Sequence, residues 1–111
     1  MIAFNISDRF PFLKIGIEEA LRTVMDPELH INIVDLGLIY TVTLQEDEMC
    51  IHIIMTLSSK SCPMGESILS AAKNCVERLF PSFKVEVELV WEPEWNYDFI
   101  SAAGIKILRG K

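Results

Sequence analysis

The fold of this chain is decided by residues 34–57, whose sequence is VDLGLIYTVTLQEDEMCIHIIMTL. Over residues 34–44 strongly apolar side chains recur at every second position, which predicts a strand with one apolar face. The odd positions of residues 49–57 are all apolar and predict a second strand. Because only the charged turn at 46–48 separates the two runs, we expect an antiparallel hairpin.

Helical and strand patterns continue on both sides of this hairpin. Residues 11–24 repeat apolar side chains at helical spacing, and Pro11 suits a first helical turn. Residues 62–80 predict a second helix, residues 83–91 a third strand, and the segment around Ser101 a short closing helix. The order predicts an α+β fold, a two-layer αββαβ(α) sandwich in which helices cover one face of a small mixed sheet.

Length and composition narrow the class of protein. The chain has 111 residues, of which 50% are hydrophobic and 23% charged, so we expect one globular domain over residues 1–111. A net charge of −6 argues against nucleic acid and anionic membrane surfaces as partners. No apolar run approaches the ~20 residues of a membrane helix, and the N-terminus does not resemble a signal peptide. Together with three widely spaced cysteines, these features favour the cytoplasm.

Cys62 is the strongest candidate for chemistry. It precedes Pro63 at the predicted start of a helix, where unpaired N–H groups and a partial positive charge stabilise a thiolate. The alternative is that the segment only caps the helix and the cysteine is incidental. Cys75 lies on the apolar side of its helix and is expected in the core. Cys50 shares a strand face with His52, but two residues do not make a metal site.

Two further groups of residues stand out. Asp26, Glu28 and Asp35 form an acidic group in which a carboxylate pair could do acid–base work, although Asp26 also suits a helix stop and Glu28 a solvated position. Trp91 continues the alternation of the last strand and is expected in the core. Trp95 lies in the loop that follows and is a candidate for partner binding.

Three segments together resemble a known family. DPELHINIVDLGLIY at 26–40, SSKSCPMGESI at 58–68 and VWEPEWNYDFISAAGIKIL at 90–108 are similar to motifs of the SufT- and PaaD-like proteins, once called domain of unknown function fifty-nine. The resemblance implies the two-layer fold shared with the C-terminal domain of NifU-type scaffolds, the FSCA domain. It also implies a role in metal–sulfur cluster biosynthesis. Lys60 departs from the family pattern, since proline is frequent at that position.

The resemblance implies a non-catalytic iron–sulfur cluster assembly or carrier factor that works with scaffold or client proteins. Carried over to this sequence, the essential cysteine is Cys62, and Asp26, Glu28, Ser58 and Ser59 would line its pocket. Because iron–sulfur clusters usually need four ligands, we expect an iron–sulfur cluster or iron to be bound transiently, with other ligands from a client, a second copy or a small thiol. The alternatives are an accessory subunit of a multicomponent oxygenase, as PaaD-like proteins are, and a thiol enzyme, which would need a base near Cys62.

Self-association is expected from the sheet face that the helices leave open. Strict alternation would place Cys50, His52, Ile54 and Thr56 on that face, next to Ile39, Thr41 and Thr43. This face is too apolar for plain solvent, and Trp95 would supply an aromatic anchor. We therefore expect a homodimer with two-fold symmetry. The alternative is a monomer in which residues 97–108 fold over the same face.

Overall fold

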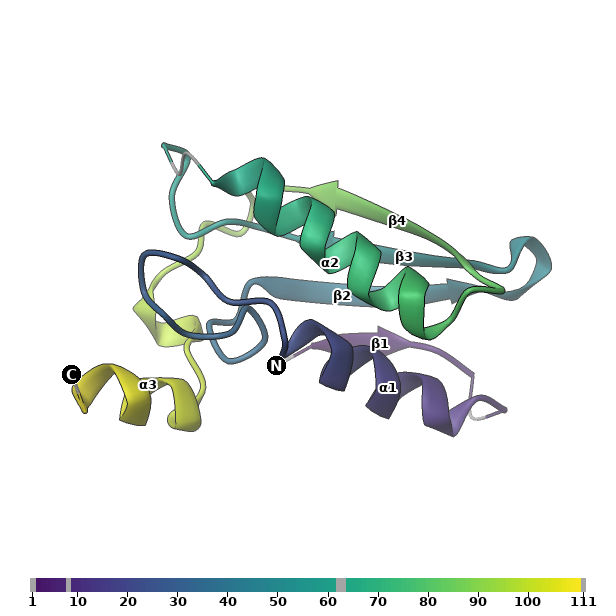
Figure 1. Ribbon diagram of the computed structural model, residues 1–111, viewed down its shortest axis with the longest axis horizontal. Helices are drawn as coiled ribbons and strands as arrows, with labels where there is room; N and C mark the ends of the chain where they lie inside the picture. The colour runs from purple at the N-terminus through teal and green to yellow at the C-terminus, as the bar shows by residue number, and fades with distance from the viewer. Residues whose placement is uncertain (1, 8, 62–63, 111) are drawn as a thin grey trace.

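The computed structural model describes residues 2–7, 9–61 and 64–110. Within these residues the chain forms a sheet, two long helices on one of its faces and a short helix beyond its end (Figure 1). In chain order the elements are β1 (Ala3–Asn5), α1 (Pro11–Leu21), β2 (Ile39–Gln45), the 3-10 turn η1 (Glu46–Glu48), β3 (Cys50–Met55), α2 (Gly65–Leu79), β4 (Lys84–Leu89), the 3-10 turn η2 (Tyr97–Phe99) and α3 (Ala102–Arg109).

The sheet is mixed and has the strand order β1-β2-β3-β4. The hairpin predicted from the sequence is present, because β2 and β3 pair antiparallel and are joined by η1. β4 pairs parallel with β3 after the crossover through α2. β1 pairs parallel with β2 and was not predicted, since a three-residue edge strand is too short to show a periodic pattern.

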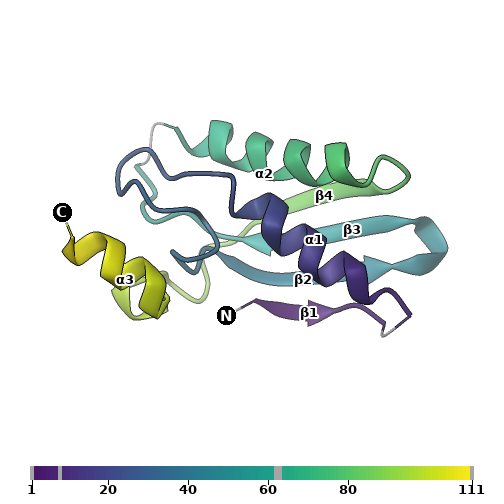
Figure 2. The same cartoon turned by 60° about the horizontal axis from the view of Figure 1, so that its bottom comes forward.

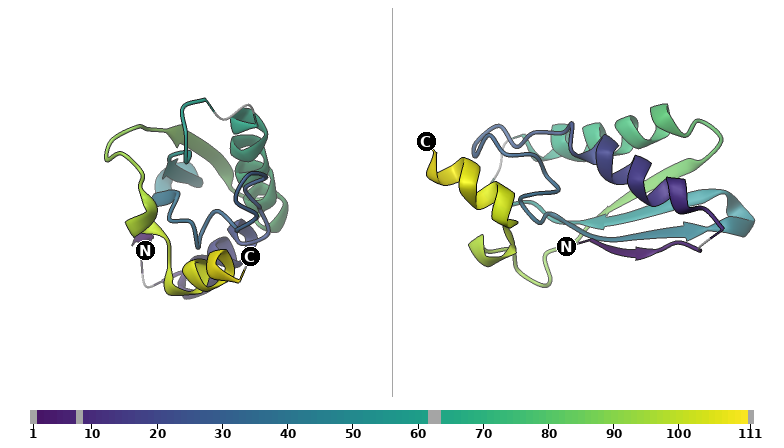
Figure 3. Two further views of the ribbon diagram at one scale, coloured as in Figure 1. Left: turned by 90° about the vertical axis from the view of Figure 1, so that its left-hand side faces the viewer. Right: turned by 90° about the horizontal axis from the view of Figure 1, so that it is seen from below.

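Helices α1 and α2 lie side by side on the same face of the sheet (Figures 2 and 3). Their close approach is possible at Gly16, because a Cβ atom there would lie 2.6 Å from the ring of Phe80 at the end of α2. No helix of the described residues is long and apolar enough to cross a bilayer. The arrangement confirms the expected α+β sandwich. The buried side chains of its core come from both layers: Leu13, Ile17, Leu21, Val42, Ile51, Ile53, Met55, Ile68, Ala72, Val76 and Val85.

Strand β2 begins later than the alternation predicted and contains an irregularity. Ile39 pairs with Met55 while Thr41 pairs with Ile54, so the register shifts by one residue at Tyr40. An extra residue of this kind turns the preceding side chain to the other face of the sheet. The expectation that Ile39 lies beside Thr41 on the open face was therefore wrong, and Ile39 is 2% exposed among the core residues.

Helix α3 closes the fold at the end of the sheet. A short closing helix was predicted around Ser101, and Ser101 is the N-cap of α3. Its Oγ accepts a hydrogen bond from the N–H of Gly104 at 3.0 Å. Figure 3 shows α3 beyond the ends of the strands and not over the open face of the sheet. The alternative in which residues 97–108 cover that face therefore does not describe this structure.

Candidate functional site

The segments singled out in the sequence gather at one end of the molecule. The loop after α1, the loop after β3 and the loop after β4 all lie at the end where α3 closes the fold (Figure 1). Cys62 and Pro63 lie outside the described residues, so the role assigned to Cys62 stays a prediction. The chain on either side of them is described, and it shows which side chains the neighbouring loops place together.

Asp26 organises the loop after α1. Its side chain is 1% exposed, and Oδ1 accepts hydrogen bonds from the backbone N–H groups of Glu28 at 2.8 Å and Leu29 at 2.9 Å. The backbone of Asp26 also pairs with Ile31 and His30, which closes residues 26–31 into a tight loop. His30 adopts a left-handed conformation with φ 58° to complete it. Burial of this carboxylate is thus accompanied by hydrogen bonds to backbone donors, as a buried charge requires.

The second oxygen of Asp26 connects this loop to the segment that precedes Cys62. Ser58 Oγ donates to Asp26 Oδ2 over 3.5 Å. A contact of this length contributes little energy, but it shows that the two segments meet. The structure therefore brings together two of the four predicted pocket residues, from loops 32 positions apart in the chain.

Residues 58–61 lie against the loop after β4. Ser59 Oγ is 2.9 Å from Ser61 Oγ and accepts from the N–H of Ser61 at 3.2 Å. The ammonium of Lys60 lies 5.6 Å from the centroid of the Trp91 ring, within the range of a cation–π contact. A hollow of about 250 Å³ separates the two loops, and Ser58 and Ser59 are among the residues that line it.

The other wall of this hollow is held by two long-range hydrogen bonds. The indole N–H of Trp95 donates to the carbonyl of Leu36 at 2.7 Å, and the hydroxyl of Tyr40 donates to the carbonyl of Pro93 at 2.8 Å. Trp95 is half-buried, and its ring meets that of Tyr97 edge-on. The structure thus gives Trp95 an intramolecular contact, while its role toward a partner stays a prediction.

Glu28 is placed differently from the other predicted pocket residues. Its backbone N–H is bound by Asp26, but its side chain is exposed and it is not among the residues that line the hollow. The loop therefore presents one buried carboxylate and one solvated carboxylate, and not a paired acid and base in direct contact.

Asp35 is a connecting residue whose part the sequence did not reveal. Its carboxylate is bound by Arg22 at 2.9 Å, Asn32 at 2.7 Å and Ser101 at 2.8 Å, which ties the end of α1 to the start of α3. Burial by itself disfavours the charged form, but the hydrogen bonds from Asn32, Ser101 and Arg22 outweigh it and lower the pKa of Asp35. The Asn32-x-x-Asp35 spacing, typical of local side-chain capping, was the available signal.

The two described cysteines are both at least half-buried. Cys50 is 2% exposed, and burial raises the pKa of its thiol. It pairs with Lys84 and alternates with Ile51, so it keeps the side of β3 that carries His52. Cys75 is half-buried and not a core residue; burial also raises its pKa, and its thiol donates to the carbonyl of Ala72 at 3.2 Å. Among the described residues, no three His, Cys, Asp or Glu side chains gather as metal ligands would.

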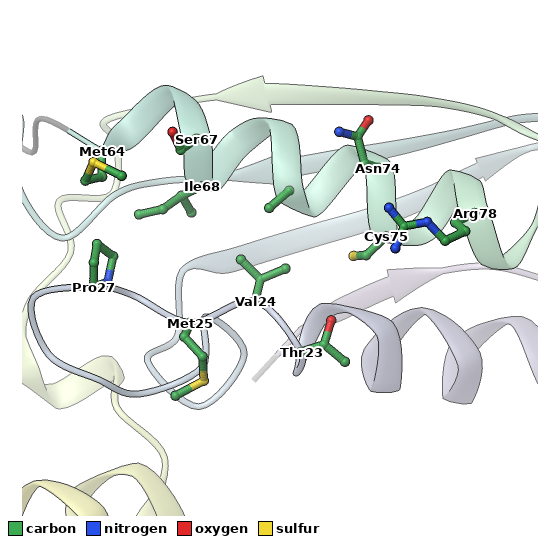
Figure 4. Close-up of a pocket in the computed structure, with 11 residues that line it drawn as sticks. Thr23, Val24, Met25, Pro27, Met64, Ser67, Ile68, Asn74, Cys75 and Arg78 are labelled. Atoms are coloured by element: carbon green, nitrogen blue, oxygen red, sulfur yellow. The ribbon is translucent and has the colours of Figure 1, made fainter.

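A second hollow lies on the helix layer. It lies between α2 and residues 23–27 and has a volume of about 500 Å³ (Figure 4). Pro27 and Met64 form one end, and Arg78 lies toward the other. Cys75 points into it from α2, which explains its partial exposure.

Comparison with known proteins places this geometry in a family. Residues 15–89 match the sequence model of the family described as iron–sulfur cluster assembly protein. The chain is 43% identical over 89 residues to the Fe-S protein maturation auxiliary factor YitW of Bacillus subtilis (strain 168), covering 80% of this chain and 86% of that protein. It is 41% identical over 78 residues to the Fe-S protein maturation auxiliary factor SufT of Staphylococcus aureus (strain USA300), covering 70% and 88%.

Comparison with solved structures agrees with the sequence matches. A crystal structure from Bacillus anthracis, described as a domain of unknown function DUF59, superposes with a TM-score of 0.83 at 33% sequence identity, covering 91% of this chain and 95% of that one. A conserved hypothetical protein from Thermotoga maritima superposes with a TM-score of 0.70 at 28% identity, covering 89% and 90%. The matched region spans more than half of the chain, and this protein therefore belongs to the family of iron–sulfur cluster assembly proteins.

Proposed function

We propose that this chain is a non-catalytic assembly or carrier factor for the maturation of iron–sulfur proteins, and that iron or a cluster passes through the thiolate of Cys62. The relatives at 43% and 41% identity are named as iron–sulfur protein maturation auxiliary factors. The observation that supports the site is the contact between Asp26 and Ser58, which joins the loop after α1 to the segment leading into Cys62.

In this proposal Asp26 is a positioning residue and not a metal ligand. One of its oxygens already accepts two backbone hydrogen bonds, the other faces Ser58, and the side chain is 1% exposed. A carboxylate in this state stabilises the conformation of its loop, and releasing it to bind iron would break the two hydrogen bonds from the backbone N–H groups of Glu28 and Leu29.

The cargo needs ligands from outside this chain. The thiolate form binds iron, and burial raises the pKa of both Cys50 and Cys75, which favours their neutral thiols. One thiolate supplies a quarter of the usual ligand set of a cluster. We therefore propose that a client protein, a scaffold protein or a second copy of the chain completes the coordination, which keeps the association transient.

The experiment that tests this proposal is cluster transfer under anaerobic conditions. The protein is incubated with ferrous iron and sulfide, followed by absorption spectroscopy, and then mixed with a purified iron–sulfur enzyme in its apo form. We expect the wild-type chain to speed recovery of that enzyme, and Cys62→Ala to lose most of the effect. Cys50→Ala is the matched control and should retain it. No acceleration by the wild type, or equal acceleration by Cys62→Ala, would overturn the proposal.

A further inference from the structure

The groove between α2 and residues 23–27 exposes apolar side chains at one end. Met64 is 46% exposed and lies opposite Pro27 across the groove (Figure 4). Met25 is 52% exposed on the same 23–27 segment, and its side chain points away from α2. Ile68 forms part of the floor and is buried. Methionine side chains are flexible and polarizable, and exposed ones are typical of surfaces that bind varied apolar partners.

The other end of the groove is positively charged. Arg78 is the charged side chain among the described residues that line it, and Figure 4 shows its guanidinium extending back along α2 toward Asn74 and Cys75. It is exposed, and no ion pair to it is formed within the described residues. An unpaired guanidinium at the border of an apolar groove favours a carboxylate from a partner.

The groove leads to the candidate site. Pro27 follows the buried Asp26 directly, and Met64 is the first described residue after Cys62 and Pro63. A molecule that lies in the groove with one end at Met64 is therefore held close to the segment proposed to carry iron or a cluster. A volume of about 500 Å³ is within the range of pockets that hold a few side chains of a ligand.

We propose that this groove binds a short peptide segment of a client apoprotein, with apolar side chains packed on Pro27, Met64 and Ile68 and an aspartate or glutamate paired with Arg78. Identification of the partner as a client rests on the proposed function. The polar side chains of Asn74 and Ser67 lie along the same groove and provide hydrogen-bonding groups for the backbone of an extended peptide. The positive charge of Arg78 favours an acidic residue in the peptide, because the other side chains that line the groove are neutral.

The test is a selection from random short peptides displayed on phage, carried out on the full chain without iron or sulfide. We expect the wild-type chain to enrich peptides that combine apolar residues with aspartate or glutamate, and Arg78→Glu to enrich lysine or arginine instead. Lys73→Glu is the matched control, because it makes the same change of charge on an exposed face of α2 outside the groove. It should select the same peptides as the wild type.

The best peptide is then synthesised and its Kd measured by fluorescence anisotropy. Arg78→Glu should weaken binding by about tenfold, equivalent to about 1.4 kcal/mol. Met64→Ser is a second variant, at the apolar end of the groove, and should also weaken binding. No enrichment by the wild type, or selection unchanged by both variants, would overturn the proposal. A mass change of Arg78→Glu in light scattering would also overturn it, in favour of a second copy as the occupant.

This selection separates the failure of the groove from the failure of the proposed function. Peptide binding requires no metal. If the chain selects acidic apolar peptides but does not speed cluster transfer, the proposal of a peptide groove stands and the proposed function fails. If the chain speeds cluster transfer but selects no peptides, the proposed function stands and the proposal of a peptide groove fails.

Discussion

At the scale of single residues, Asp26 combines near-complete burial with two short hydrogen bonds from backbone N–H groups. Replacing it by alanine leaves the N–H groups of Glu28 and Leu29 without their acceptor, so we expect Asp26→Ala to lower the free energy of unfolding by about 1–3 kcal/mol. Urea unfolding followed by circular dichroism measures the change. Glu28→Ala is the control, because its side chain is exposed, and it should stay within about 0.5 kcal/mol of the wild type. Similar losses for both variants would contradict the positioning role of Asp26.

The three cysteines should differ in reactivity. Cys50 is buried, Cys75 is half-buried, and burial raises the pKa of both thiols. The sequence predicts a helix from Cys62, where a thiolate would be stabilised, whereas α2 begins at Gly65 with Met64 as its N-cap, three positions further along the chain. We expect Cys62 to react with iodoacetamide faster than either of the others in the folded protein, as followed by mass spectrometry of peptides at timed intervals. Equal labelling of the three, or faster labelling of Cys75, would contradict the prediction.

Residue types were easier to predict from the sequence than their contacts. Asp26, Ser58 and Ser59 were candidate residues because they lie in the motifs that resemble the SufT- and PaaD-like family. The sequence does not show that the Asp26 carboxylate accepts hydrogen bonds from its own loop, because the tight turn that brings these backbone N–H groups close is visible only in the structure. Similarly, Asp35 finds Ser101 across 66 positions of the chain, which no local pattern indicates.

At the scale of elements, Asp35 fastens α3 and the end of α1 to the same loop. The pKa of its carboxyl is lowered in the folded chain, since the hydrogen bonds from Asn32, Ser101 and Arg22 outweigh the effect of burial. Its stabilisation is therefore present above the unfolded pKa of about 3.9 and is lost as the pH falls through the folded value. We expect the free energy of unfolding of the wild type to decrease more steeply below about pH 5 than that of Asp35→Asn. Parallel curves from urea unfolding at a series of pH values would contradict this.

The turn before β2 depends on a glycine. Gly37 has φ +78°, and a Cβ there would lie 2.2 Å from the carbonyl oxygen of Phe99. Strain from the left-handed backbone and from the clash together predict that Gly37→Ala destabilises the fold by about 2–4 kcal/mol. Gly110→Ala is the matched control, because its nearest neighbours would lie at 3.4 Å and its φ is −73°. Thermal unfolding of both variants measures the difference in stability. Equal midpoints would contradict the close packing of Gly37 against Phe99.

The same turn explains why element boundaries were harder to predict than elements. Alternation over residues 34–44 suggested one continuous strand, but residues before Ile39 form turns fixed by Asn32, Asp35 and Gly37. Leu36 and Leu38 are buried in the core although they lie in or next to these turns, so their spacing imitates a strand pattern. The hairpin and both long helices were predictable because each buries one face over several periods.

At the scale of the whole molecule, the layers separate two kinds of surface. The proposed peptide groove lies on the helix layer, next to the segments around Asp26 and Ser58. The opposite face of the sheet is left uncovered by the described helices (Figure 3). Pairing aligns Thr43 with His52 on this face, and His52 Nε2 lies 3.1 Å from Glu88 Oε1. A partner can therefore occupy the sheet face while a client occupies the groove.

The open face of the sheet is the surface on which we expect the homodimer to form. Ile54 is half-exposed on the open face beside Thr41, with Glu88 opposite on β4. We predict that two copies meet through this face with two-fold symmetry, and that light scattering over a concentration series gives the mass of a dimer. Ile54→Lys places a charge at the centre of the face and should give a monomer with little change in thermal unfolding, since the new ammonium lies next to Glu88.

The matched control for that variant is Ile15→Lys, the same substitution on the outer side of α1, where the side chain is 63% exposed. It should remain a dimer, because an interface of about 1,000 Å² or more on the sheet face does not reach the helix layer. A monomeric wild type at high micromolar concentration, with and without iron and sulfide, would remove both the dimer and a cluster shared between two copies. Dissociation by Ile15→Lys and not by Ile54→Lys would place the contact on the helices, where it would compete with a client for the groove.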